Sequence, residues 1–434
     1  MAIGRARGAA MRIEIRNGRV VDPAAGTDRT ASVFVADGKI AAVGQAPAGF
    51  RADRTIEASG LVVAPGLVDL NARLREPGLE HKATLDSELK AAVAGGVTRL
   101  ACPPDTDPPL DEPGLVEMLK QRARLANRAH VHPVGALTVG LAGTTLTEMG
   151  ELADAGCVAY SQGDVPIADT QVLLRAMQYA ATFGHRVWLR PQDAYLARGG
   201  VAHEGEIATR LGLPAVPSCA ETVAIGTILA LARETGVRVH LQRLSTAEGV
   251  AMVREAKRAR MPVTCEVAAH HLHLCDVDIG WFDSQARLDP PLRGTRDRAA
   301  LRAGLADGTI DVVSSDHAPV DDDAKQVPFG EAEAGATGLE LLLSLTLKWA
   351  AEDGVSLVDA LARVTSAPAA VLGVEAGSLG PGAVADLCVF DPSAWWLVGQ
   401  RSLASQGRNT PFLGHELPGR VRWTLVGGQV VHEA

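Results

Sequence analysis

Paired cysteines are absent from this sequence. The cysteines lie far apart and no two of them form a C-x-x-C pair; they are Cys102, Cys157, Cys219, Cys265, Cys275 and Cys388. A signal-like segment at the start and a long uncharged apolar run are absent too. These absences argue against structural disulfides and a membrane span, and they predict a soluble protein of the reducing cytoplasm.

An excess of positive charge is also missing. The chain has 42 lysine and arginine residues against 51 aspartate and glutamate residues, for a formal net charge of −9. This balance argues against a nucleic-acid or anionic-membrane partner. With 434 residues, 47% of them hydrophobic and 21% charged, the composition is globular and excludes disorder. At about 150 residues per domain, the length allows two or three domains.

Both ends of the chain show patterns typical of β-structure. Apolar and polar residues alternate from Met11 onward, and Asn17-Gly18 and Asp37-Gly38 are dipeptides typical of hairpin turns. Residues 385–390 and 423–431 repeat this pattern near the other end. We therefore predict that the two ends meet in one small sheet domain.

The middle of the chain alternates short apolar strands with segments of helical periodicity, which is typical of βα units around a parallel sheet. The run of candidate strands fits an α/β fold of the (β/α)8 TIM-like barrel class with insertions, since a bare barrel takes roughly 250 residues. An open doubly wound sheet is disfavoured because no G-x-G-x-x-G follows the first strand. The candidate strands lie near residues 67–70, 97–101, 131–137, 157–160, 187–189, 237–241, 263–267 and 310–314.

These patterns predict a division of the chain. Residues 11–62 and 376–434 form a composite β-sandwich, and residues 63–375 form the barrel. Residues 1–10, MAIGRARGAA, are small and basic, and we expect them to be a flexible extension.

Polar side chains follow most of the predicted barrel strands. Because an active site in such a barrel forms at the carboxyl ends of the strands, these are the candidate site residues. In chain order they include Asn71, Arg73, Arg75, Asp105, Gln162, Gly163, Asp164, Arg190, Arg243 and Asp316.

Several motifs then occur in the order found in one enzyme family. They are Ala64–Asp69, Leu74–Gly78, Gly199-Gly200, Asp289–Arg293, Asp311–Pro319 and Asn409–Phe412. From Met11 onward the sequence resembles the dihydroorotases of the cyclic amidohydrolase group. The resemblance implies a metal-dependent barrel with a composite β-sandwich, and hydrolysis of L-dihydroorotate to N-carbamoyl-L-aspartate.

The resemblance also implies one or two zinc ions, since hydrolysis of a cyclic amide at neutral pH needs a metal-activated hydroxide. Of the family's ligands, only the aspartate after the eighth strand, Asp316, is retained. An arginine offers no lone pair to a cation, so we predict that the zinc centre is absent, that no cofactor is bound, and that Asp316 is a remnant without function. The positions that match the other ligands hold Asn71, Arg73, Gln162, Gly163, Arg190 and Arg243.

The positions that match the family's substrate-binding residues have changed as well. Arg75, which the resemblance assigns to the substrate carboxylate, is retained. Asp105 and Asp289 stand where the family has asparagines, and Val320 stands where it has a histidine. Carboxylates near an anionic ligand repel it, so dihydroorotate binding is also in doubt.

We expect the arginines at the former metal positions to be neutralised by carboxylates. In this hypothesis Arg73, Arg190 and Arg243 pair with Asp316, Asp105, Asp289 and Asp164, because Arg–carboxylate pairs satisfy several hydrogen bonds together. A second possibility is that they form, with Arg75, a site for phosphate or a carboxylate metabolite, but internal ion pairs are favoured.

The histidines receive structural interpretations. His270, His271 and His273 are read as hydrogen-bonding groups after the seventh strand, and His130 and His132 as packing residues on one face of the third strand. Only His317, next to Asp316, is expected near the mouth.

These features predict a catalytically inactive dihydroorotase homologue. Ser161 and Ser245 lie near strand ends, but neither has a plausible His–Asp relay, so no nucleophile is evident. The resemblance includes inactive dihydroorotase-like chains of some bacteria that associate with aspartate carbamoyltransferase. We therefore expect a structural or assembly subunit for aspartate carbamoyltransferase in pyrimidine biosynthesis, and a homo-oligomer. The alternatives are an active dihydroorotase with an unusual metal centre, and an anion-binding regulatory subunit.

Overall fold

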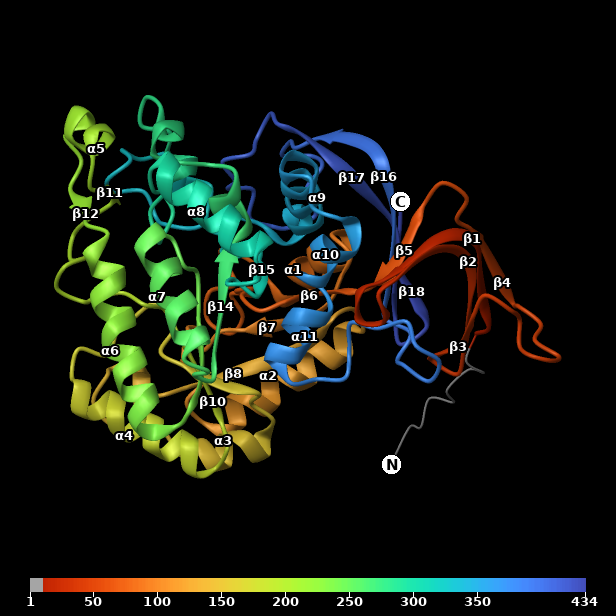
Figure 1. Cartoon of the computed structure of the whole chain (residues 1–434), viewed down its shortest axis with the longest axis horizontal. Helices are drawn as coiled ribbons and strands as arrows, with labels where there is room; N and C mark the ends of the chain where they lie inside the picture. Colours follow the sequence, from red (N-terminus) through yellow and green to blue (C-terminus); the bar gives the residue numbers. More distant parts are fainter. Residues whose placement is uncertain (1–10) are drawn as a thin grey trace.

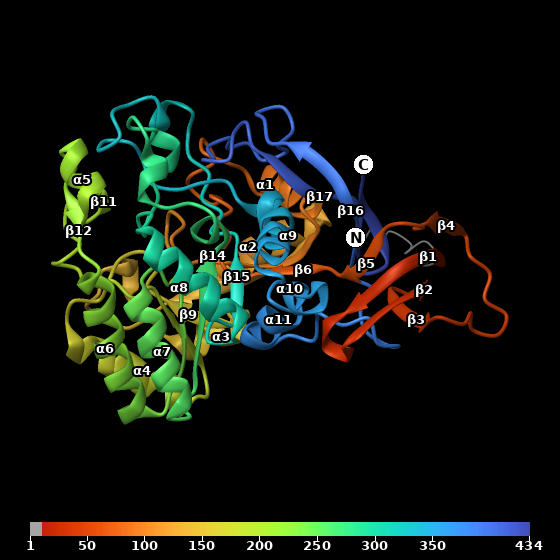
Figure 2. The same cartoon turned by 45° about the horizontal axis from the view of Figure 1, so that its top comes forward.

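The computed structural model describes residues 11–434, which form a barrel and a second large sheet. Figure 1 shows the barrel with its surrounding helices on the left and the sheet made from both chain ends on the right. The turned view in Figure 2 shows the same two parts side by side. The predicted fold class, a (β/α)8 barrel joined to a β-rich part from the two ends, is confirmed. The predicted extension, residues 1–10, lies outside the described residues.

The barrel strands follow one another around the ring in chain order and pair in parallel. The ring closes between its first and last strands through a bridge of Ala72 with His317. Around it, Arg73 N donates to His317 O at 2.9 Å and His317 N donates to Asn71 O at 3.1 Å. The strands are β6 (Leu67–Asp69), β7 (Val97–Cys102), β8 (His130–Ala136), β9 (Ala159–Ser161), β10 (Arg186–Leu189), β13 (Arg238–Leu241), β14 (Val263–Ala268) and β15 (Val312–Ser314).

Helices surround the barrel, and glycines follow the ends of two of them. The first helix is followed by Gly95, and the sixth by Gly236 in the left-handed conformation that glycine adopts easily. The helices are α1 (Leu85–Ala94), α2 (Pro113–Ala126), α3 (Met149–Ala155), α4 (Thr170–Thr182), α5 (Glu206–Leu211), α6 (Cys219–Thr235), α7 (Ala247–Arg258), α8 (Thr295–Ala306), α9 (Leu342–Asp353), α10 (Leu357–Ala362) and α11 (Ser366–Leu372).

Short elements occupy several loops. A small two-stranded sheet pairs β11 (Ala202–His203) with β12 (Ala215–Val216) around α5, an insertion between β10 and α6. The short 3-10 helices are η1 (Pro23–Ala25), η2 (Val139–Leu141), η3 (Ala269–Leu272), η4 (Asp276–Ile279), η5 (Ser284–Ala286), η6 (Asp323–Lys325) and η7 (Leu339–Leu341). Among residues 11–434, every helix is too short or too polar to cross a membrane.

The second sheet joins strands from both ends of the chain. It contains β1 (Ile13–Asp22), β2 (Thr27–Ala36), β3 (Lys39–Val43), β4 (Arg54–Glu57), β5 (Val62–Pro65), β16 (Leu387–Leu397), β17 (Glu416–Val426) and β18 (Gln429–Glu433). Strand β5 pairs with β1 on one side and β16 on the other, so it connects the two ends. The predicted boundary between residues 62 and 63 falls within this strand, and the domain limits stay a prediction.

One of the two predicted hairpin turns is wrong. Asp37-Gly38, with both φ angles positive, makes the turn between β2 and β3 as predicted. Asn17-Gly18 instead lies inside β1, where the pairing register with β2 shifts between Ile15 and Gly18. The dipeptide therefore makes a β-bulge, because the positive φ of Asn17 suits a bulge as well as a turn.

The interior of the barrel is packed at the end opposite the mouth. Apolar side chains of β6, β7, β8 and β10, among them Val68 and Trp188, are fully buried together with Leu372 of α11. This packing makes the barrel interior a core and leaves polar chemistry to the other end.

Candidate functional site at the barrel mouth

The carboxyl ends of the barrel strands bring the predicted site residues together. Arg73, Arg243 and Asp316 are buried there, with relative exposures of 5%, 3% and 5%. They follow β6, β13 and β15, and they meet because all strands of a parallel barrel end at the same rim. Seven charged residues make up what we call the arginine–aspartate network: Arg73, Arg190, Arg243, Asp105, Asp164, Asp289 and Asp316.

Arg73 contacts three carboxylates of this network. Its Nε donates to Asp105 Oδ2 at 2.7 Å, and its Nη2 donates to Asp164 Oδ2 at 2.7 Å. Its Nη1 lies 3.5 Å from Asp316 Oδ1. Arg73, at the position that matches a metal-binding histidine of the family, therefore uses its nitrogen donors in ion pairs.

The other two arginines complete the network. Arg243 donates from Nη1 to Asp316 Oδ1 at 3.3 Å and to the carbonyl oxygen of Asp289 at 3.0 Å, and it pairs with Asp164 through Nη2. Arg190 donates from Nη1 to Asp289 Oδ2 at 2.7 Å and lies 3.7 Å from Asp164 Oδ1. The pairing expected from the sequence is thus present, and Asp164 contacts all three arginines.

The network shifts the ionisation of two aspartates in opposite directions. Burial alone would raise the pKa of Asp164, but Arg243, Arg73 and Arg190 hold it well below its usual range. Burial raises the pKa of Asp316 to about 6, against the opposing effect of Arg243 and Arg73. Asp164 is therefore the permanent anion of the network, and Asp316 is the group that can take up a proton near neutral pH.

Asp316 is also fixed by hydrogen bonds from the first strand. Asn71 Nδ2 donates to Asp316 Oδ1 at 3.0 Å. Below it, the fully buried Asp69 accepts from Ser315 N at 2.9 Å and from the Ser315 hydroxyl. These bonds hold the loops after β6 and β15 together; Asp69 ends the motif Ala64–Asp69, but sequence reasoning assigned it no role.

Three site residues have left-handed backbone conformations. The φ angles are 61° for Arg75, 54° for Arg243 and 46° for Asp316. Such angles in non-glycine residues cost roughly 1–3 kcal/mol each and gather at functional sites. The backbone of the mouth thus keeps a strained geometry although the side chains at the metal positions have been replaced.

Arg75, which the resemblance assigns to the substrate carboxylate, has only part of its hydrogen-bonding capacity used. Arg75 Nε donates to Pro319 O at 2.9 Å, and its terminal nitrogens have no protein partner among residues 11–434. Burial and the neighbouring Arg73 lower the pKa of Arg75. Asp105 and Asp289, which replace the family's asparagines, are committed to Arg73 and Arg190.

The donor set does not fit zinc. Within residues 11–434, His, Cys, Asp and Glu side chains nowhere form a group of three that could hold a metal ion. At the mouth the only carboxylate at a family ligand position is Asp316, and it is surrounded by guanidinium groups, which repel a cation. Gln162 and Gly163 do not compensate, since Gln162 accepts from Thr138 and donates to Leu141 O.

Of the nearby histidines, His270 lies next to the network, and His271, His273 and His317 have partners outside it. His271 Nε2 lies 3.3 Å from Pro291 O and His273 Nε2 lies 2.9 Å from Leu345 O, so both bind backbone carbonyls. His270 Nε2 lies 3.9 Å from Asp316 Oδ2, and burial lowers the pKa of His270 well below its usual value. His317 points away from the mouth and contacts Glu88 of α1, a buried partner that sequence reasoning missed.

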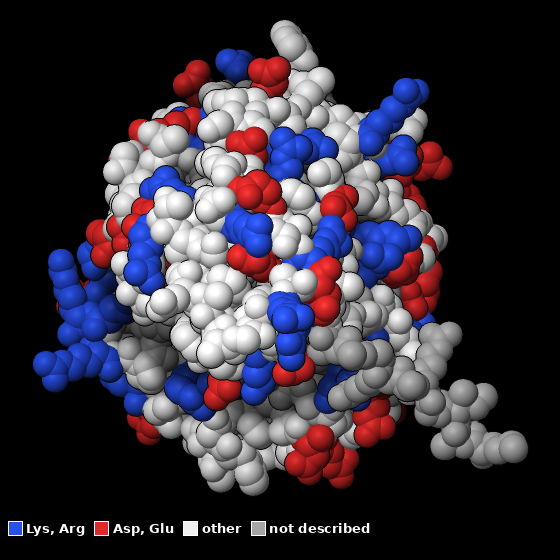
Figure 3. All heavy atoms as spheres, turned by 90° about the vertical axis from the view of Figure 1, so that its right-hand side faces the viewer, with Lys and Arg blue, Asp and Glu red and all other residues white. Residues whose placement is uncertain are grey.

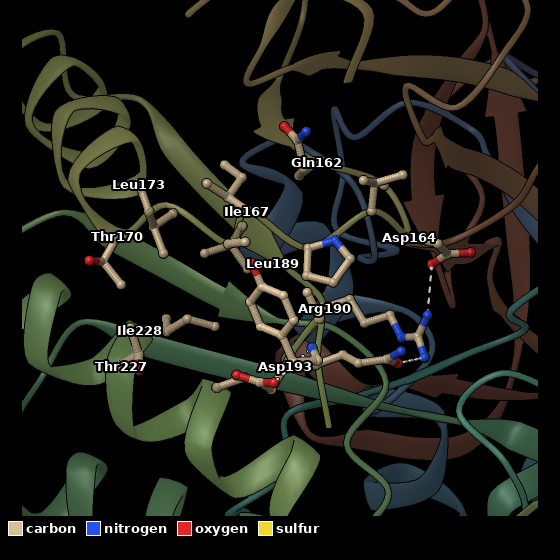
Figure 4. Close-up of a pocket in the computed structure, with 18 residues that line it drawn as sticks. Gln162, Asp164, Ile167, Thr170, Leu173, Leu189, Arg190, Asp193, Thr227 and Ile228 are labelled. Atoms are coloured by element: carbon tan, nitrogen blue, oxygen red, sulfur yellow. Dashed lines mark hydrogen bonds and ion pairs between the residues drawn. The ribbon is translucent and has the colours of Figure 1, made fainter. Parts of the chain in front are cut away.

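A small pocket adjoins the network beside β9 and β10. Figure 4 shows Arg190 and Asp164 at its polar side and apolar side chains from four segments on the other. Its cavity measures about 100 Å³, below the roughly 300–1,000 Å³ usual for ligand pockets. Sequence reasoning missed it because its wall, which includes Ile167, Leu189 and Ile228, has no local motif.

Comparison with known proteins agrees with this architecture. The family described as Dihydro-orotase-like matches residues 60–249, and the Amidohydrolase family matches residues 190–431. A Dihydroorotase-like protein from Pseudomonas putida is 47% identical over 97% of this chain and 99% of its own length. A Dihydroorotase from Citrifermentans bemidjiense is 40% identical over 98% of this chain and 100% of its own.

Solved structures show the same fold. An L-hydantoinase (dihydropyrimidinase) from Arthrobacter aurescens has a TM-score of 0.87 and 25% identity, covering 98% of this chain and 96% of its own. A D-hydantoinase has a TM-score of 0.82 at 23% identity. The fold and the relatives define an amidohydrolase-type barrel, and within that class the chain belongs to the dihydroorotase-like proteins of the amidohydrolase family.

Proposed function

We propose that this protein is a dihydroorotase homologue without hydrolase activity that acts as a structural or assembly subunit for aspartate carbamoyltransferase. The observation that carries the proposal is the arginine–aspartate network. Guanidinium groups of Arg73, Arg190 and Arg243 stand where the family's metal ligands would be, and each is ion-paired with aspartate.

Hydrolysis of a cyclic amide needs an activated water or another nucleophile, and the mouth offers neither. Asp316 could act as a general base, although its Oδ1 accepts from Asn71, Arg73 and Arg243, but no nucleophile for it to activate is evident at the mouth. The two serines near strand ends are also engaged. Ser245 Oγ donates to Glu221 Oε2 at 2.5 Å and Ser161 Oγ donates to Gln242 Oε1 at 3.4 Å.

A structural role fits a protein whose fold is complete while the residues at the family's metal-ligand positions differ. The barrel closes, its rim is tied by ion pairs, and the terminal sheet is continuous. The partner is proposed from the resemblance to inactive dihydroorotase-like chains that associate with aspartate carbamoyltransferase.

The test has two parts. Zinc would be measured by elemental analysis on the purified protein, and dihydroorotase activity assayed on the same sample with and without added zinc. Co-expression with the aspartate carbamoyltransferase of the same organism, followed by sedimentation, would test assembly. We expect no zinc, no turnover and a stable complex; turnover of L-dihydroorotate, or two separate sedimenting species, would overturn the proposal.

A second candidate is an active dihydroorotase with an unusual metal centre. Relatives named Dihydroorotase, 40–43% identical to this chain, favour it. Stoichiometric zinc with turnover is its signature. Against it stand the guanidinium groups around Asp316, which would have to move before a metal could enter.

A third candidate is an anion-binding regulatory subunit that uses the mouth. The free terminal nitrogens of Arg75 favour it. L-Dihydroorotate or N-carbamoyl-L-aspartate would then raise the melting temperature of the wild type but not of Arg75→Gln.

A further inference from the structure

A hollow lies at the opposite end of the barrel from the mouth. It opens between the last turns of α2 and the start of β8, with Gly156 after α3 and Val426 of β17 on its sides. Its cavity measures about 390 Å³, which falls within the roughly 300–1,000 Å³ of small-molecule sites. We call it the basic pocket because its polar lining consists of Lys120, Arg124, Asn127, Arg128, His130 and His132.

The pocket is positive in a protein that is negative overall. Three of its lining side chains are lysine or arginine, two are imidazoles and none is a carboxylate, whereas the whole chain has a net charge of −9. On the face seen in Figure 3, acidic and basic side chains are scattered among uncharged ones, and a group of basic side chains lies at the left-hand margin. A concave group of one sign raises the local concentration of ions of the other sign.

The cations of the pocket keep donors free for a ligand. Lys120 Nζ donates one hydrogen bond, to Ala155 O at 2.6 Å, and retains two N–H groups. Arg128 uses Nε towards Asp86 at 3.4 Å. Arg124 is exposed, and its guanidinium has no ion-pair partner within residues 11–434. Lys120 and Arg124 lie at the carboxyl ends of α3 and α2, and Arg128 pairs with Asp86, but each keeps N–H groups that these contacts do not use.

The two histidines of β8 face the same hollow because they alternate along the strand. His132 Nε2 is enclosed without a hydrogen-bond partner among residues 11–434, whereas His130 Nε2 lies near Asp386. Burial, with smaller effects of Arg99 and His130, lowers the pKa of His132 to about 4, so its imidazole is neutral near pH 7.

Asp386, the carboxylate next to the histidines, does not cancel this charge. Asp386 Oδ2 lies 3.5 Å from His130 Nε2. It already accepts from Arg99 Nε at 3.0 Å, and Asp386 Oδ1 accepts from Gly427 N at 2.8 Å. Asp386 thus neutralises Arg99 behind the wall of the pocket, and the lining itself keeps its charge.

We propose that the basic pocket binds a small phosphate-type oxyanion, either free phosphate or the phosphate group of an ester. Lys120, Arg124 and Arg128 supply charge-assisted hydrogen bonds from α2 and the turn after it, and the imidazoles of His130 and His132 also line the pocket. This site is separate from the mouth, and it does not depend on whether the mouth is catalytic.

The experiment is isothermal titration calorimetry of the full chain with inorganic phosphate and with ribose 5-phosphate, at constant ionic strength. We expect Arg124→Gln to weaken binding roughly tenfold, as the loss of one charge-assisted hydrogen bond would. Arg128→Gln is a second variant of the same kind. Arg175→Gln is the matched control, because Arg175 is exposed on α4 and contacts only Gln178.

The outcomes test whether the anion binds in the basic pocket and whether it is a free ion or an ester. Binding that is weakened in Arg124→Gln and Arg128→Gln but not in Arg175→Gln supports the pocket. Tighter binding of ribose 5-phosphate identifies an ester as the ligand, and tighter binding of phosphate identifies the free ion. Absence of binding to the wild type, equal binding by all variants, or loss of binding in Arg75→Gln alone would overturn the proposal, the last by placing the anion at the mouth.

Discussion

The guanidinium of Arg73 lies 2.7 Å from the carboxylate of Asp164, although the two residues stand 91 positions apart in the chain. Asp164 also pairs with Arg243 and lies near Arg190. A single aspartate therefore joins the loops after four barrel strands, β6, β9, β10 and β13.

Removal of Arg73 should destabilise the protein strongly. In Arg73→Ala, Asp105, Asp164 and Asp316 lose a buried counter-ion, and breaking such a pair typically costs about 3–5 kcal/mol. The free energy of unfolding, measured with urea, would show the loss. The control Arg175→Ala should change it by less than about 0.5 kcal/mol, since that side chain is exposed. Equal losses in the two variants would mean that the network adds no stability.

Ionisation of Asp316 should lower the free energy of unfolding as the pH rises from 5 to 7.5. Its pKa is raised to about 6 from the 3.8 of an ordinary aspartate, so the folded state holds more protons than the unfolded state between these values. The stabilisation is complete below the lower pKa and is lost as the pH rises through 6.

The test compares the wild type with Asp316→Asn, which cannot titrate. The variant should gain about 1 kcal/mol relative to the wild type when the pH is raised from 5 to 7.5. Urea unfolding at the two pH values measures it. A difference between the two proteins that does not vary with pH would show that Asp316 ionises normally.

Metal removal should leave the fold unchanged. Because the donors at the mouth are guanidinium groups, neither EDTA nor added zinc has a site through which to shift the melting temperature. Differential scanning fluorimetry with EDTA, zinc and, as a control ion, magnesium checks this. Melting that drops with EDTA and recovers with zinc alone would restore a metal centre.

Glu88 should be needed for stability although it lies outside the mouth. Its Oε2 accepts from His317 Nε2 at 2.6 Å and from Ser405 Oγ at 2.6 Å, and its Oε1 accepts from Gln406 N at 3.1 Å. Gly338 N donates to His317 Nδ1, so the imidazole must carry its proton on Nε2.

In Glu88→Gln one side-chain oxygen becomes an NH2 group that cannot accept these bonds. The unfolding free energy should fall by about 1–3 kcal/mol. Glu117→Gln on the exposed face of α2 is the matched control. If both variants unfold at the same urea concentration as the wild type, the contact of α1 with His317 is not a structural bond.

The barrel could be predicted from the sequence because short, local patterns mark its strands and helix ends. Each strand is a short apolar run, and glycines such as Gly236 mark helix ends, so the βα order could be read along the chain. Asn17-Gly18 misled because the same positive φ suits a hairpin turn and a bulge. Only the partner strand decides between them, and that information is not local.

Site residues could be predicted where a family motif surrounds them, and they could not be predicted elsewhere. Arg73, Arg190 and Arg243 were found because they replace histidines within recognisable flanks, and opposite charges nearby predicted their partners. Asp69 and Glu88 were missed, since an acidic residue in a strand or helix has no pattern that marks it as buried.

The closure of the barrel has a consequence for how the protein is made. The first and last strands meet through the bridge of Ala72 with His317, and the rim above it is tied by side chains alone. A rim tied by its own residues is complete as soon as the chain has folded. In a zinc-starved cell, the amount of folded protein should then follow its rate of synthesis, with no step of ion loading in between.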